Sequence, residues 1–108
     1  MAAELVAQFP VLAAQQRLFA AGGGYEIVHR TAGMEVGVYV LIAPGTDDQQ
    51  PHEDDEAYVV LSGQGTLVIG EDRRPLREGE GAYVAARVPH HFEDFERLSL
   101  LVFFSRPG

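Results

Sequence analysis

Two histidines and one glutamate are the residues of this chain whose types and spacing point most directly to chemistry. His52 and Glu56 stand four positions apart, ahead of a β-branched run that ends at Gly63. His90 comes later, between a strand-like run and a polar turn. Two neutral imidazoles and a carboxylate can hold a metal ion and leave positions open for water, dioxygen or substrate. This ligand set suits Fe(II), Mn(II), Zn(II), Ni(II) or Cu(II) without choosing among them.

Side-chain alternation predicts how these residues could meet. If the segment 50–56 is extended, Gln50, His52 and Glu56 share one face, and so does Asp54, for which we expect a position in solvent. An ionised Glu56 inside a barrel is costly unless a cation or hydrogen bonds compensate it. The spacing alone also fits a surface histidine on an acidic loop, where neighbouring acids would favour its protonated form.

The remaining histidines and several aromatic residues could also take part in chemistry, but a structural role is more ordinary for each of them. His91 should point away from His90 on a strand, which favours the surface, and His29 is expected at an exposed or edge position. Four aromatic residues either line a pocket or form plain core: Tyr39, Tyr58, Phe92 and Phe103.

The elements that must position these residues are mostly strands. The pattern of residues 9–21 predicts one short helix, which ends at the run of glycines that begins with Gly22. We expect this helix to cover one edge of the domain. From Tyr25 onward, short runs rich in Val, Ile, Tyr and Phe alternate with turn residues. The expected strands are 25–31, 35–43, 57–62, 66–69, 74–76, 82–85, 90–95 and 98–105. About eight such strands favour an all-β sandwich or barrel. We expect a helical cap segment over 1–24 and a barrel over 25–108, within one domain.

Composition narrows the partners. The 108 residues carry a formal net charge of −8, which argues against nucleic acid and anionic membranes as partners. The absence of cysteine excludes disulfides and thiolate ligands. The N-terminus lacks the basic and long apolar regions of a signal peptide, so a cytoplasmic location is expected.

Two motifs resemble those of the cupin superfamily. The usual first cupin motif is a Gly, then His-x-His, three or four residues, Glu, six residues and Gly. Here the same order reads Gly45, Gln50-x-His52, three residues, Glu56, six residues and Gly63. Gln50 replaces the first histidine, as in some metal-dependent members such as the phosphomannose isomerases.

The second motif is Gly, five residues, Pro-x-Gly, two residues, His, three residues and Asn. This chain reads Gly79, five residues, Ala85-x-Arg87, two residues, His90, three residues and Asp94. These replacements lie at turns or beside the ligands and should leave the fold intact.

The resemblance implies a small single-domain cupin, with a jelly-roll β-barrel and a short N-terminal helix. It implies a divalent metal held by His52, Glu56 and His90, with Gln50 a weak or outer ligand. The implied function is a metal-dependent enzyme of dioxygenase, isomerase or lyase type acting on a small molecule, with Glu56 also a proton acceptor.

Two alternatives stay open: a non-catalytic small-ligand-binding or sensor barrel, and a metal-free, epimerase-like enzyme that uses His52 or His90 as a base. The apolar last strand and the exposed sheet edges of a small jelly roll predict a homodimer.

Overall fold

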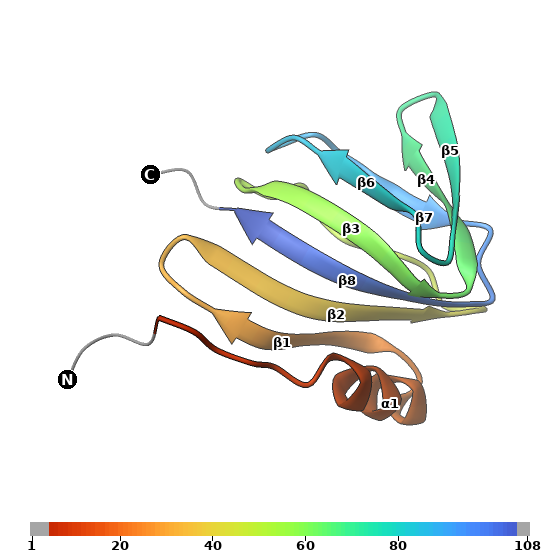
Figure 1. Cartoon of the computed structure of the whole chain (residues 1–108). Helices are drawn as coiled ribbons and strands as arrows, with labels where there is room; N and C mark the ends of the chain where they lie inside the picture. Colours follow the sequence, from red (N-terminus) through yellow and green to blue (C-terminus); the bar gives the residue numbers. More distant parts are fainter. Residues whose placement is uncertain (1–4, 106–108) are drawn as a thin grey trace.

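The computed structural model describes residues 5–105, which form two antiparallel sheets and one helix (Figure 1). The five-stranded sheet has the order β1 (Gly24–Arg30), β2 (Met34–Ile42), β8 (Arg97–Ser105), β3 (Asp55–Ser62) and β6 (Gly81–Val84). The three-stranded sheet has the order β5 (Asp72–Arg77), β4 (Gln64–Ile69) and β7 (His91–Glu93). Consecutive strands alternate between the sheets late in the chain, which is the jelly-roll arrangement that the sequence predicts.

The helix α1 (Val11–Ala21) covers one end of the larger sheet. Gly22 follows it with a left-handed backbone (φ 89°) that a residue with a side chain rarely adopts, and its N–H caps the last turn. Leu18 and Ala14 pack against Val38 and Val40 of β2. In residues 5–105, no helix is long and apolar enough to cross a membrane.

The main core lies between the two sheets. Alternate residues of β3 and β8 face inward, so that Tyr58 pairs with Val102 and Val60 with Leu100 across the ladder. Phe92 of β7 joins them from the smaller sheet, with its ring 5.1 Å from that of Tyr58. This packing sets the inward face on which the site is built.

The structure confirms the all-β class, and the strands lie within a few residues of their expected bounds. Hydrogen bonds within residues 5–105 join the strands into two sheets rather than a closed ring. Residues 1–4 of the expected cap and 106–108 of the expected barrel lie outside the described residues, and the boundary at residue 24 stays a prediction. The segment 45–54 is irregular, so the alternation expected over 50–56 begins only at Asp55.

Candidate metal and ligand site

A buried pair of Glu56 and His90 lies at the centre of the candidate site. Glu56 is the second residue of β3, paired with Phe104 on one side and Val84 on the other, and its side chain is only 3% exposed. His90 stands just before β7 on the smaller sheet, and its Nε2 lies 2.9 Å from Glu56 Oε1. The two atoms are close enough for an ion pair, but they are not aligned as a hydrogen bond, and Oε1 has no other partner.

Hydrogen bonds around His90 set its protonation. Nδ1 lies 2.8 Å from the carbonyl oxygen of Val88, which can only accept, so Nδ1 carries a hydrogen. The amide nitrogen of Gln49 donates to the Asp47 carboxylate, and the amide oxygen of Gln49 therefore accepts from the Tyr58 hydroxyl at 3.0 Å. With that hydrogen used, His90 Nε2 must donate to the Tyr58 oxygen, 2.8 Å away. This arrangement holds an imidazolium beside the Glu56 carboxylate.

The local electrostatics agree with this assignment. Burial by itself lowers the pKa of His90, but the contact with Glu56 and the bond to Val88 outweigh it, so the pKa lies above its usual value. Burial and the negative charge of Glu56 raise the pKa of Tyr58 well above its ordinary value, which keeps the phenol protonated. The raised pKa of His90 therefore favours its protonated form beside Glu56.

Asp47 fixes the irregular loop against both sheets. Its buried carboxylate accepts hydrogen bonds from the Tyr39 hydroxyl on β2, from the backbone and side-chain nitrogens of Gln49, and from the backbone N–H of Phe92 on β7 at 2.9 Å. A carboxylate can accept several hydrogen bonds at once, so one side chain ties three segments together. Through Gln49, the same residue sets the direction of the bonds around Tyr58.

His52 is held by the loop that carries the second sequence motif. Its backbone carbonyl accepts a hydrogen bond from the Arg87 N–H at 2.6 Å, and Asp55 accepts one from the Ala86 N–H at 2.9 Å. Arg87 has a left-handed backbone (φ 66°), which explains why the corresponding motif position usually holds Gly. The His52 ring packs edge-on against Phe104, with centroids 4.7 Å apart.

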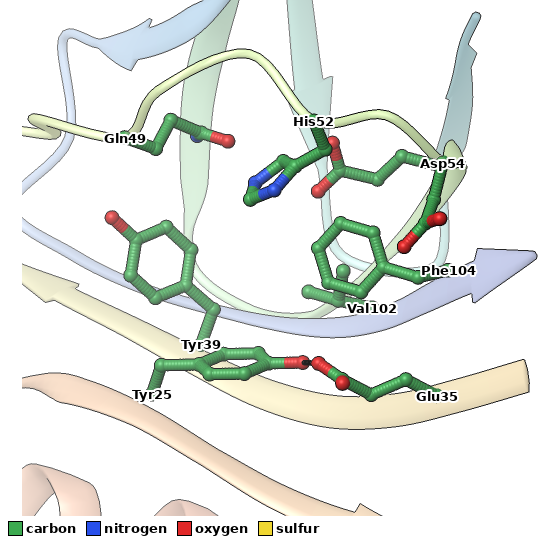
Figure 2. A pocket seen from close by; sticks show the side chains of 9 residues that line it. Tyr25, Glu35, Tyr39, Gln49, His52, Asp54, Val102 and Phe104 are labelled. Carbon is green, nitrogen blue, oxygen red and sulfur yellow. Dashed lines mark hydrogen bonds between the residues drawn. The ribbon is translucent and has the colours of Figure 1, made fainter. Parts of the chain in front are cut away.

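A cavity of about 330 Å³ opens beside this cluster (Figure 2). It is enclosed by β1, β2, β3, β8 and the irregular loop, and it brings His52 and Glu56 to one space. Nine residues line it. The aromatic ones are Tyr25, Tyr39 and Phe104, the acidic ones are Glu35, Asp54 and Glu56, and the others are Gln49, His52 and Val102. His90 contacts Glu56 from the other side and lines a neighbouring pocket with Gln49 and Gln50.

The structure therefore brings some of the predicted ligands together and leaves Gln50 outside the site. Glu56 and His90 touch and His52 lines the same cavity as Glu56, but in residues 5–105 no three His, Asp or Glu side chains converge as a ready metal cluster. Gln50 is exposed, with its amide nitrogen 3.5 Å from the carbonyl oxygen of Asp48. The irregular loop is the reason, because it turns Gln49 inward instead.

Two of the less favoured histidines lie outside the cluster. His91 contacts Glu93 at 2.6 Å with 41% of its side chain exposed, and the half-buried ring of His29 stacks on Phe9. Asp54, expected in solvent, instead lines the cavity.

Sequence reasoning missed Asp47 and Gln49. Nothing in their spacing marks them, since both lie in an acidic, polar stretch that resembles a solvated loop. The available signal was indirect: a small barrel with inward phenols such as Tyr39 and Tyr58 needs buried acceptors for their hydroxyl groups.

Comparison with known families agrees with this geometry. Residues 38–104 match the family model of the cupin domain, and they include both motifs and every residue of the Glu56–His90 cluster. The chain belongs to the cupin family. An uncharacterized protein of Streptomyces coelicolor is 41% identical over 86 residues, which span 79% of this cupin and 82% of that protein.

Solved structures share the fold at low identity. The DMSP lyase DddQ of Ruegeria pomeroyi is 17% identical with a TM-score of 0.71, over 82% of this cupin and 49% of the lyase chain. The cupin domain of an XRE family transcriptional regulator from Enterobacter cloacae is 19% identical with a TM-score of 0.71, over 81% and 99% of the two chains. Enzymes and regulators therefore both occur among its structural neighbours, and the fold alone selects neither.

Proposed function

We propose that this cupin binds a divalent transition metal through Glu56, His90 and His52 and acts on a small molecule held in the adjoining cavity. The observation that carries the proposal is the buried, unsatisfied Oε1 of Glu56 beside His90 Nε2. A buried carboxylate is costly unless a cation compensates it. The imidazolium of His90 is that cation here, and a metal ion held by Oε1 and Nε2 would take its place.

The donor set fits such an ion. Glu56 Oε1 and His90 Nε2 are separated by 2.9 Å, close enough for one ion to be held by both atoms. Nδ1 of His90 already donates to the Val88 carbonyl, the outer contact that fixes a histidine with Nε2 toward a metal. His52 lines the same cavity as Glu56 and would supply the third ligand.

The protein's own groups define what the site can do. When bound, a divalent metal supplies Lewis-acid polarisation of a substrate oxygen. Tyr58 and Gln49 orient the His90 ring, while Glu56, which lines the cavity beside it, would be the carboxylate that accepts a proton from a substrate. Because His90 Nε2 carries a proton in the arrangement described, metal binding there releases one proton to solvent.

Metal content measured by inductively coupled plasma mass spectrometry tests the proposal. We expect near-stoichiometric metal in the parent protein and a loss of about tenfold or more in Glu56→Gln, His90→Ala and His52→Ala. His91→Ala is the matched control, because His91 follows His90 in sequence but is 41% exposed and pairs with Glu93. Gln50→Ala tests whether the exposed amide contributes as a ligand. Equal metal in parent, Glu56→Gln and His90→Ala proteins would contradict the proposed site.

A second function is favoured by one observation, the imidazolium–carboxylate pair of His90 and Glu56 with the Tyr58 hydroxyl beside it. Such a pair can exchange a proton with a substrate without any metal, as a general acid or base. Dialysis against a chelator separates the two readings, because turnover of a substrate found by screening survives chelation only in the metal-free case. A sensor or carrier barrel would bind that molecule without converting it.

The homodimer stays a prediction. Val59 and Tyr83 are exposed on adjacent strands of the larger sheet, while α1 contacts mainly β1 and β2. Sedimentation velocity at micromolar concentration checks it, and a monomeric profile would count against it.

A further inference from the structure

Three aromatic rings from three different strands enclose one side of the cavity. Tyr25 on β1 is nearly perpendicular to Tyr39 on β2, with ring centroids 6.1 Å apart at 78°. Tyr25 is also nearly perpendicular to Phe104 on β8, with centroids 6.4 Å apart at 79°. Figure 2 shows Tyr39, Tyr25 and Phe104 around the same hollow, with His52 above it. We call Tyr25, Tyr39 and Phe104 the aromatic box.

The aromatic box is fixed before any ligand arrives. Tyr25 lies across β2 at Gly37, where a Cβ atom would clash with its ring and hydroxyl group, so the glycine makes room for the phenol. The Tyr25 hydroxyl donates to Glu35 Oε2 at 2.8 Å, and Tyr39 donates to the buried Asp47. Both phenols are therefore anchored at their far ends, which leaves their ring faces as cavity wall.

Carboxylates are the most frequent ionisable groups in the lining around the aromatic box. Among the nine described residues that line the cavity, three are carboxylates, Glu35, Asp54 and Glu56, one is the imidazole of His52, and none is an arginine. Arg30 pairs with Glu35 at 2.8 Å but is not part of the lining. Perpendicular ring faces and carboxylates together attract a cation that has lost part of its water.

We propose that the cavity recognises a small molecule with an alkylated cationic head, of the trimethylammonium kind, which the aromatic box holds. The inference names the substrate class of the site described under the proposed function and rests on that function. An alkylated cation fits because it has no N–H groups that need hydrogen bonds, and its charge spreads over methyl groups that pack against ring faces. The cavity volume of about 330 Å³ suits a ligand of this size.

Orientation follows from the position of the aromatic box. Tyr25 and Tyr39 lie on β1 and β2, whereas Glu56 lies on β3 and His52 on the irregular loop. Phe104 of β8 lies between the two groups, because it pairs with Glu56 and its ring packs against His52. A cationic head in the aromatic box therefore directs the rest of the molecule toward His52 and Glu56. The reacting part of the substrate would be the uncharged or anionic end.

Choline and 3,3-dimethyl-1-butanol form the matched pair of probes, because they share shape and hydroxyl group and differ in the charge of the head. Isothermal titration of the metal-loaded protein should show choline binding about tenfold or more tightly than the neutral alcohol. Tyr25→Leu removes one ring and should weaken choline binding about fivefold to tenfold. Tyr25→Phe keeps the ring and should stay within about twofold of the parent.

The outcomes separate this inference from the metal proposal. Metal content is measured on the same samples, and the titration is repeated after chelation. Stoichiometric metal with equal binding of the two probes, or with no choline binding, overturns the aromatic box as a cation site and leaves the metal site standing. Preferential choline binding by a protein that takes up no metal supports the cation site and contradicts the metal proposal. Equal losses in Tyr25→Leu and Tyr25→Phe would also overturn the inference, since the hydroxyl rather than the ring would then matter.

Discussion

The site is built from two regions that are held in place by different means. Glu56 and Tyr58 lie on β3, where backbone ladders to β8 and β6 fix their direction. Gln49 and His52 lie on an irregular loop that has no ladder: the Asp47 carboxylate holds the part with Gln49, and the Arg87 N–H holds the His52 carbonyl. The comparison teaches that strand register sets the buried acid, whereas a few separate hydrogen bonds set the loop that faces it.

Removal of the Asp47 carboxylate should have the largest effect on the stability of the loop. Asp47→Ala leaves buried donors on Tyr39, Gln49 and Phe92 without an acceptor, so we expect a loss of about 3 kcal/mol in the free energy of unfolding. Urea denaturation measures this. Asp48→Ala is the matched control, because that exposed neighbour should change stability by less than about 0.5 kcal/mol. Similar effects of the two substitutions would mean that Asp47 does not hold the loop.

Substitutions of the adjacent residues Gln49 and Gln50 test which of the two faces inward. Gln49→Ala removes the link between Asp47 and Tyr58 and should cost about 1–2 kcal/mol. Gln50→Ala removes an exposed amide and should cost less than about 0.5 kcal/mol. Thermal denaturation of both variants in metal-free buffer compares them. If Gln50 were the residue that faces inward, the order of the two losses would be reversed.

Arg87 provides a substitution expected to stabilise. Its φ of 66° is strained for a residue with a side chain, and Arg87→Gly should raise the free energy of unfolding by about 1 kcal/mol. The exposed contact of Arg87 with Glu53 at 4.0 Å offsets little of this gain. Asp94→Asn serves as a control at the second left-handed position, where both residues tolerate the conformation. A destabilised Arg87→Gly protein would show that the arginine side chain, not its backbone, matters there.

The smallest expected effect is the pH dependence of the free energy of unfolding that comes from the His90–Glu56 pair. The pKa of His90 is raised in the folded protein, whereas unfolded histidine titrates near about 6.5. The stability from protonated His90 is therefore complete below about pH 6.5 and is lost as the pH rises through the folded pKa. Urea denaturation of metal-free protein at a series of pH values should show this decline in the parent and a flatter profile in Glu56→Gln. Parallel profiles would mean that Glu56 does not hold the proton on His90.

The same comparison explains how much the sequence could predict. Period-two runs and turn residues predict all eight strands and the short helix, because strand alternation and glycine punctuation are local properties of the chain. Glu56 and His90 were selected by residue type and motif spacing, and their role as metal ligands stays a prediction.

The conformation of the loop 45–54 could not be predicted from local sequence patterns. Alternation was expected through Gln50, but residues 45–54 follow no ladder, so Gln49 rather than Gln50 faces inward. The role of Asp47 depends on acceptors and donors that come from β2 and β7, far apart in sequence, and no local pattern records them. The aromatic box is of the same kind, because Tyr25, Tyr39 and Phe104 meet only through sheet order.

One measurement tests the central claim most directly: a crystal structure of the metal-loaded protein, with anomalous diffraction recorded at the absorption edge of the metal found in it. The account predicts one strong anomalous peak within bonding distance of Glu56 Oε1 and His90 Nε2, with the His52 ring turned toward it. A peak only at the surface pair of His91 and Glu93, or none inside the barrel, would contradict the account.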